Sequence, residues 1–478
     1  MNTAFRFFIA LSFLSLPATM PAQRPSPEQR PDLSGKALLT KATPDAKSTA
    51  SPKPAKAVKQ YAIEQFMNTT RVGGSAFTAD EKTVLFHSNK SGIFNVYSIP
   101  VAGGEPKQLT NSTKESTYVA TAFPTDARFL YRHDAGGNEN EHLYLRELDG
   151  SERDLTPGEK TKANFLGWSK DQKSFFISTN ERDPKFFDIF ELSIADLKPQ
   201  LIYQDETGFD FADISGDKRF LAFGKPGRTT ADADVYLYDR EKQEMKNITA
   251  HEGEIDNQPQ VFDVASKYFY FLSDEGAEFK YIARYELGTG KREVVEKAPW
   301  DVSAIYFSRN GKYRVVATNE DARTRIIVTE EATGKSVELP SLPDGDVTGV
   351  NFSESEKLMA FYHNGSRSPA NLFVYDLASK KPARLTDSLN PEIDPADLVE
   401  VRVIRYKSFD GLEIPGILYQ PHGFSGQKKT PALVLVHGGP GGQARTEYKA
   451  YAQYLANHGY TILDVNNRGS SGYGKTFF

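Results

Sequence analysis

Two glycine-rich segments near the end of the 478-residue sequence have residue types suited to chemistry on a carbonyl group. The first is HGGPGG, residues 437–442. Attack on an amide carbonyl places negative charge on its oxygen, and backbone N–H groups held near that oxygen stabilise the transition state, each by roughly 3 to 4 kcal/mol. Adjacent glycines let the main chain approach without a Cβ in the way. The segment is therefore a candidate oxyanion loop, with a simple strand-ending Gly-Pro turn as the alternative.

The second segment is NNRGSSGYG, residues 466–474, and it overlaps a different motif. Residues 469–476 read GSSGYGKT, which matches the phosphate-loop pattern and would place Lys475 on phosphates and Thr476 on magnesium. That pattern needs a following helix and a later acidic magnesium ligand, and two residues follow Thr476. The HGGPGG segment one strand earlier also favours a different chemistry. We therefore expect no nucleotide site.

A serine nucleophile for such an oxyanion loop is missing from residues 1–478. The nucleophile elbow of α/β-hydrolases has the pattern GxSxG, and no serine has glycine both two before and two after it. Ser471 comes nearest, with Gly469 before it but Tyr473 after it. None of the eight histidines follows a nucleophile, as the base of a triad must in this fold. We expect the chain by itself to be inactive.

The elements around the two glycine segments predict the start of a doubly wound α/β domain. An apolar run at residues 431–436 fits a strand buried on both faces, and residues 444–457 have the spacing of an amphipathic helix. A second buried strand, 460–465, leads into the second segment, and Asp410-Gly411 predicts a hairpin before the first. We assign residues 390–478 to the N-terminal part of an α/β-hydrolase domain, whose last strand would lack the elements that normally cover it.

The sequence before this domain contains a repeat. The same turn recurs in units such as Phe77–Asp80 and Trp168–Asp171, and the fourth positions of the units are 80, 126, 171, 217, 265, 310 and 355. Consecutive units are thus 46, 45, 46, 48, 45 and 45 residues apart. Four short strands in such a period are typical of a propeller blade. We predict an all-β seven-bladed propeller over residues 60–389, in preference to an open stack of repeats.

The N-terminus has the composition of a targeting segment. Arg6 precedes an apolar run over residues 7–16, and small residues continue to Ala22, which predicts a signal peptide over residues 1–22. We expect export, periplasmic or secreted, and no stable membrane insertion after cleavage, since the run is too short to cross a bilayer. The alternative is an ordinary apolar N-terminus. Residues 23–59, rich in Pro, Ser, Ala and Lys, are predicted to be a disordered linker.

Composition excludes several further classes of function. The 58 basic and 63 acidic side chains give a net charge of −5, without the basic surplus of a nucleic-acid-binding protein. The absence of cysteine excludes disulfides and thiol nucleophiles. Nothing in the residue pattern calls for a metal or organic cofactor.

A propeller followed by HGGPGG, a helix and NNRGSSGYG resembles the prolyl oligopeptidase family of serine peptidases, especially its acylaminoacyl-peptidase-like and dipeptidyl-peptidase-like branches. The resemblance runs from about Tyr61 to Phe478. It implies hydrolysis of short peptides through an acyl-enzyme, with the propeller limiting access. It also implies that the Gly439 N–H is one oxyanion donor, that His437 shapes the loop rather than acting as the triad base, and that Arg468 holds the site's framework.

One further segment could contact substrate. The blade loop 136–141 carries Glu139 and Glu141, either of which could bind a substrate amine, although a solvated loop is the simpler interpretation. Two other functions stay open. The chain could be a non-catalytic propeller that binds peptides or surface polymers with a vestigial hydrolase segment, or it could belong to another α/β-hydrolase such as the proline iminopeptidase type, which shares HGGPGG.

Overall fold

The computed structural model describes residues 58–478 except 344, 425–428 and 440. The expected signal peptide, residues 1–22, and the linker up to residue 57 lie outside the described residues. Within the described part, no helix is both long and apolar enough to span a membrane.

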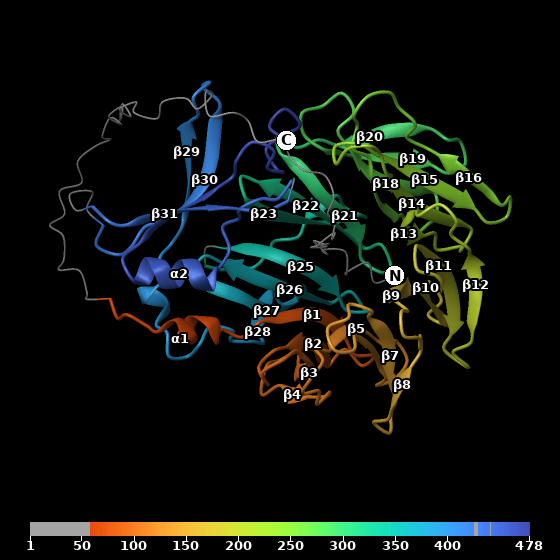
Figure 1. Cartoon of the computed structure of the whole chain (residues 1–478). Helices are drawn as coiled ribbons and strands as arrows, with labels where there is room; N and C mark the ends of the chain where they lie inside the picture. The colour runs from red at the N-terminus through yellow and green to blue at the C-terminus, as the bar shows by residue number, and fades with distance from the viewer. Residues whose placement is uncertain (1–57, 344, 425–428, 440) are drawn as a thin grey trace. The chain divides into compact units, whose positions relative to one another are not determined.

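Seven four-stranded antiparallel sheets, each formed by one continuous stretch of chain, make up residues 72–384 (Figure 1). The strands of blades one to three are β1 (Val72–Phe77), β2 (Thr83–Ser88), β3 (Asn95–Pro100), β4 (Lys107–Gln108), β5 (Tyr118–Ala122), β6 (Phe129–His133), β7 (His142–Arg146), β8 (Glu152–Asp154), β9 (Ala163–Trp168), β10 (Ser174–Asp183), β11 (Phe186–Ser193) and β12 (Pro199–Tyr203). Those of blades four to seven are β13 (Asp210–Ile214), β14 (Phe220–Pro226), β15 (Ala233–Asp239), β16 (Glu244–Asn247), β17 (Gln258–Phe262), β18 (Tyr268–Ser273), β19 (Tyr281–Glu286), β20 (Arg292–Glu296), β21 (Asp301–Phe307), β22 (Tyr313–Glu320), β23 (Arg323–Glu330), β24 (Lys335–Ser336), β25 (Asp346–Phe352), β26 (Leu358–Gly365), β27 (Ser368–Asp376) and β28 (Lys381–Arg384).

The blades close into a ring through side-chain packing. An apolar cluster fills each of the seven interfaces between adjacent blades, including the one between the last blade and the first. That last interface adds hydrogen bonds from Asn351 Nδ2 to Ser75 O at 2.6 Å and from the Tyr362 hydroxyl to Gly74 O at 2.5 Å. No strand is exchanged between these two blades. The seven-bladed propeller predicted from the sequence is confirmed.

The repeated turn unit joins the first and second strands of each blade. In five of these turns the residue after the fourth position is a non-glycine residue with a positive φ, between 54° and 63°, and in the sixth blade it is Gly311 at 75°. A residue in the left-handed region reverses the chain within a few residues. Six of the seven turn units thus share this geometry.

An eighth sheet follows the propeller. It contains β29 (Arg402–Lys407), β30 (Glu413–Tyr419), β31 (Ala432–Val436) and β32 (Thr461–Val465) in the order β29-β30-β32-β31. β31 and β32 run parallel and are connected through helix α2 (Ala450–Asn457), while the other pairs are antiparallel. A 3-10 turn, η2 (Pro395–Asp397), precedes the sheet. This arrangement confirms the expected opening of an α/β domain.

The helix expected from residue 444 begins only at Ala450. The preceding residues bind other parts of the molecule instead of continuing the helix. The Ala444 N–H donates to Asn466 Oδ1 at 2.7 Å, and the Thr446 N–H donates to Ala322 O of the sixth blade at 3.2 Å. Tertiary contacts therefore override the local helical spacing here.

A short segment ahead of the first blade packs against the α/β part. Helix α1 (Ile63–Met67) places the buried Phe66 ring 5.9 Å from the ring of Tyr454 on α2. The Tyr61 hydroxyl donates to Asp397 Oδ2 at 2.7 Å, and the Asn457 amide bonds both Tyr61 N and Lys59 O. Segments that are almost 400 residues apart in the sequence are thereby joined, with Tyr61 and Asn457 separated by 396 positions.

Candidate active site

The two glycine segments lie together at the ends of β31 and β32. The Ser470 hydroxyl donates to Asn467 O at 2.6 Å. Because its one proton is used in that bond, Ser470 Oγ accepts from His437 Nε2, which lies 2.7 Å away. Ser470 is fully buried and its proton is committed to a carbonyl, so the pair is not arranged as a nucleophile and its base. The Ser471 N–H also donates to Gly442 O at 3.2 Å. His437 therefore connects the two loops.

Asn466 is the centre of this connection, and the sequence did not single it out. Its side chain is completely buried. Its Oδ1 accepts from Ala444 N, and its Nδ2 donates to Ala444 O at 3.0 Å and to the Tyr473 hydroxyl at 2.9 Å. An asparagine directly after a buried strand is the only sequence signal for this role. Asn466 therefore fixes the far end of the first loop, at Ala444, relative to the second loop.

Gly439 has the backbone conformation and the open surroundings that an oxyanion donor needs. Its φ is +68°, a region that favours glycine, and a Cβ placed on it would meet no atom within 4 Å. Gly439 is exposed, and no hydrogen bond from its N–H to any described residue is present. A carbonyl oxygen could therefore approach this N–H.

Arg468 lies at the outer side of the second loop. Its guanidinium pairs with Asp410, in the turn between β29 and β30, and lies over the exposed ring of Phe409. The hydrogen bond from Arg468 is the main cause that lowers the pKa of the Asp410 carboxyl. Arg468 thus ties the second loop to the β29–β30 hairpin.

The phosphate-loop-like residues contact the fifth blade. Lys475 Nζ donates to Asp274 Oδ1 at 3.2 Å, and its backbone N–H donates to Glu278 O at 2.8 Å. Thr476 donates to Glu278 Oε1 from its N–H at 2.9 Å and from its hydroxyl at 2.6 Å. The lysine and threonine that a nucleotide would require are therefore engaged by propeller carboxylates.

A cavity of about 270 Å³ lies between these loops and blades four to six. The blade side contributes the carboxylates of Asp256, Asp274, Glu278 and Asp301 and the amine of Lys280, and the loop side contributes Gly441, Ser471, Gly472, Gly474, Lys475 and Phe478. Burial is the main cause that raises the pKa of Asp301, and the Lys280 N–H opposes it by donating to that carboxylate at 2.9 Å. The cavity can accept hydrogen bonds from N–H groups of a peptide.

The two glutamates of loop 136–141 are not among the residues that line this cavity. Glu141 pairs with Arg132, and Glu139 has a φ of +59° with its N–H bonded to Asp134 at 2.9 Å. The structure places Gly439, His437 and Arg468 on the two adjoining glycine loops, but neither these three residues nor Glu139 and Glu141 line the cavity. Among the described residues, no group of three His, Asp or Glu side chains is placed to hold a metal ion.

Residues 110–388 match the model of the family described as "Prolyl oligopeptidase, N-terminal beta-propeller domain". The chain belongs to the prolyl oligopeptidase family. The match covers blades two to seven. These six blades and the first blade close into one ring.

Relatives and solved structures extend this similarity beyond the propeller. The chain is 26% identical over 414 residues to dipeptidyl aminopeptidase BIII of Pseudoxanthomonas mexicana, covering 83% of this chain and 59% of that protein. It is 22% identical over 437 residues to dipeptidyl peptidase family member 6 of Caenorhabditis elegans, covering 81% and 57%. A puromycin-hydrolyzing peptidase of Mycobacterium tuberculosis shares the fold, with a TM-score of 0.69 at 15% identity over 88% of this chain and 70% of that one. The chain thus spans less than two thirds of the length of the dipeptidyl aminopeptidase and dipeptidyl peptidase relatives.

Proposed function

We propose that this chain supplies the propeller and the first part of the catalytic domain of a serine peptidase that hydrolyses short peptides through an acyl-enzyme. The observation that carries the proposal is the open Gly439 N–H, on a loop fixed by His437 and Asn466 beside an acid-lined cavity. In the reaction this N–H would stabilise the oxyanion of the tetrahedral intermediate. The nucleophile, acid and base would come from residues outside this sequence, which has no GxSxG elbow.

The proposal includes a role for the propeller in selecting substrates by size. The cavity is bounded by blades four to six on one side and by Gly441, from the same loop as Gly439, on the other, so a peptide bound at Gly439 would lie beside the propeller. The peptide N-terminus is a cation, and it would be attracted by carboxylates such as Glu278 and Asp301 or by the more distant Glu139.

Export to the periplasm or outside the cell is part of the same proposal, because residues 1–22 have the signal-peptide pattern.

Two matched variants of the complete enzyme that contains these residues test the amine site. We expect Glu278→Gln to lower kcat/KM for peptides with a free N-terminus while N-acetylated peptides change little, because one carboxylate near the cationic amine is lost. Glu139→Gln serves as the comparison, since Glu139 does not line the cavity. If neither variant changes the preference for a free N-terminus, these carboxylates do not bind it.

Hydrolysis itself is tested with the same complete enzyme and a panel of peptides from two residues upward. We expect cleavage of short peptides and inhibition by a serine-directed phosphonate. Peptide binding without any cleavage would contradict the proposal and would favour a non-catalytic propeller. Cleavage of esters or proline amides alone would favour another α/β-hydrolase chemistry.

A further inference from the structure

The third residue of each repeated turn unit lies at one end of the propeller ring. These residues are Ala79, Thr125, Lys170, Gly216, Val264, Arg309 and Glu354. The turn units join the first and second strands of the blades, whereas the α/β part contacts turns between second and third strands, for example at Ala322 and Ser366. Consecutive turns of an antiparallel sheet lie at opposite ends of the strands. The third-position residues are therefore at the end of the ring away from the glycine loops.

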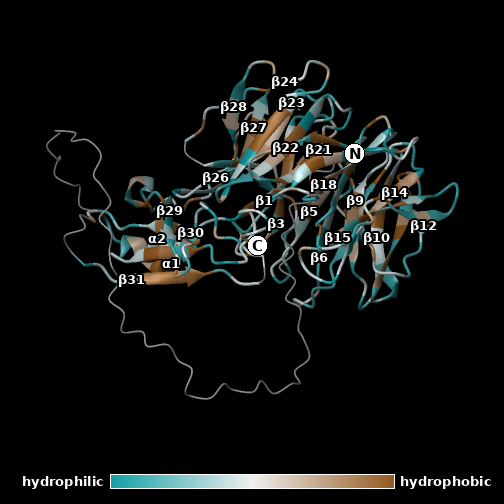
Figure 2. Ribbon diagram, turned by 90° about the horizontal axis from the view of Figure 1, so that it is seen from above, coloured by the Kyte–Doolittle hydropathy of each residue, from teal (hydrophilic) through white to brown (hydrophobic). Residues whose placement is uncertain are grey.

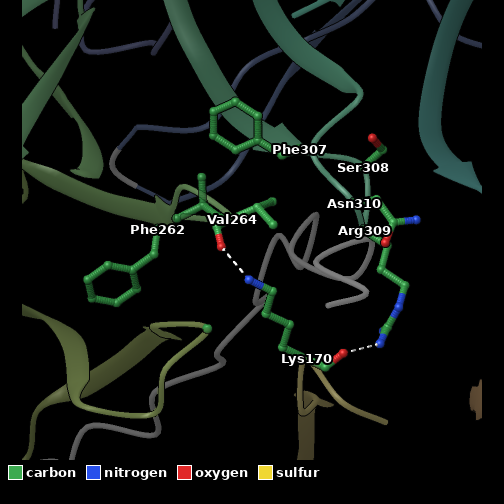
Figure 3. Close-up of a pocket in the computed structure, with 9 residues that line it drawn as sticks. Lys170, Phe262, Val264, Phe307, Ser308, Arg309 and Asn310 are labelled. Atoms are coloured by element: carbon green, nitrogen blue, oxygen red, sulfur yellow. Dashed lines mark hydrogen bonds between the residues drawn. The ribbon is translucent and has the colours of Figure 1, made fainter. Parts of the chain in front are cut away.

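Arg309 extends across the ring at this end. Its guanidinium donates to Lys170 O at 2.8 Å (Figure 3). It also donates to Ser169 O at 3.4 Å. Arg309 belongs to the sixth blade and Ser169–Lys170 to the third, and in a ring of seven no two blades are farther apart. A second bond from Arg309 Nε to Glu354 Oε1, at 2.8 Å, reaches the seventh blade. The Arg309 side chain is only 8% exposed, whereas the Glu354 side chain is 48% exposed and Lys170 is exposed.

Lys170 makes a second link between blades that are not neighbours. Its Nζ donates to Val264 O of the fifth blade at 3.1 Å (Figure 3). A pocket of about 200 Å³ remains between these side chains, with Phe262 and Phe307 in its wall. Both cations thus bind backbone carbonyls of other blades, and such charge-assisted hydrogen bonds are stronger than neutral ones.

We propose that Arg309 and Lys170 close the channel of the propeller at the end away from the glycine loops. A peptide entering through that end would have to break the bonds that join blade six to blade three and blade three to blade five. Peptides would therefore reach the glycine loops from the side of the α/β part. The consequence for substrate size rests on the proposed peptidase function, but the closure itself does not.

A labelling experiment tests the closure without requiring catalysis. Ser303 is exposed on β21, the first strand of blade six, between Asp301 at one end and Phe307 at the other. Because the chain has no cysteine, Ser303→Cys introduces a single reactive thiol. We expect a maleimide carrying a bulky polymer to react faster when Arg309→Ala is added, because the reagent then gains a second route beside the one from the side of the α/β part.

Two further variants make the result decisive. Lys170→Ala removes only the bond to Val264, since Arg309 binds the backbone of Lys170, and we expect a smaller acceleration from it. Arg325→Ala is the matched control, because Arg325 pairs with Glu320 of its own blade and should not change the rate. A small maleimide should react equally with all variants if each is folded. Equal rates of the bulky reagent with and without Arg309 would overturn the proposal.

The consequence for substrates is measured on the complete enzyme. We expect Arg309→Ala to raise kcat/KM for long peptides relative to a dipeptide substrate, with no change in the relative rate for Arg325→Ala. An unchanged ratio in an active enzyme would show that this end does not limit entry. An enzyme that cleaves no peptide at all would contradict the proposed function, whereas the labelling rates would still decide the closure.

Discussion

His87 in the first blade is a single buried residue that makes the stability of the protein depend on pH. Its ring lies against Phe94 and Tyr118, and a Cβ on Gly73 would lie 2.5 Å from His87 Nε2, so glycine is required to admit the ring. Burial is the main cause that lowers the pKa of His87 to about 3, and the nearby charge of Arg132 adds to it. The folded protein therefore holds a neutral imidazole.

We predict that His87 makes the protein less stable as the pH falls. The folded pKa lies below the unfolded value of 6.5, so its contribution is complete above pH 6.5 and is lost between pH 6.5 and about 3. The loss is up to about 1.4 kcal/mol per pH unit. Urea unfolding at several pH values gives the slope of the free energy of unfolding against pH. This slope should be smaller in His87→Leu than in the wild type. Equal slopes in the wild type and His87→Leu would refute the prediction.

Asn466 carries the second residue-scale prediction. Asn466→Ala leaves the buried N–H and carbonyl of Ala444 without partners, and we expect a loss of about 2 to 3 kcal/mol in the free energy of unfolding of the α/β part. Asn467→Ala is the control, because its exposed side chain bonds only Arg468 O. Urea unfolding measures both, and equal stability of the two variants would mean that Asn466 does not hold the loops together.

At the scale of elements, β31 is an edge strand with an uncovered apolar face. Val434 and Val436 are each 64% exposed, while Leu435 on the other face packs against the core beneath α2. Figure 2 shows β31 as a hydrophobic strand at the edge of its sheet. Edge strands with apolar side chains tend to pair with other chains. Among the described residues, no element covers this face.

We therefore predict that the protein with residues 1–478 self-associates through β31. Placing charges on the strand, with Val434→Lys and Val436→Lys together, should shift sedimentation at micromolar concentration toward the monomer. Tyr406→Lys, on the opposite edge strand, should have little effect on sedimentation. A monomer that sediments identically before and after the two β31 substitutions would rule the prediction out.

Elements were predictable from the sequence where their signals are local. Turn residues within a few positions predict the blade turns and the hairpin at Asp410-Gly411. Apolar runs of similar length predict β31 and β32. The start of α2 was predicted six residues too early, because Ala444 and Thr446 bond to Asn466 and Ala322, which lie elsewhere in the sequence. The contacts that position the site, such as Lys475 with Asp274 across 201 positions, left no local signal.

At the scale of the whole molecule, a closed propeller and the first part of an α/β domain are combined in one chain. The ring was predictable because its unit repeats seven times, and its closure by packing between blades one and seven confirms that count. The site was predictable only as two glycine loops. How these loops meet, through His437 and Ser470, required the structure.

The central claim is that these residues form the oxyanion side of a serine peptidase site whose nucleophile lies outside them. The most direct test is labelling by a serine-directed fluorophosphonate, with the protein of residues 1–478 compared with the complete enzyme. We predict stoichiometric labelling and peptide hydrolysis for the complete enzyme, and neither for residues 1–478. Labelling of a serine within residues 1–478, together with amide hydrolysis that the same reagent abolishes, would contradict the claim.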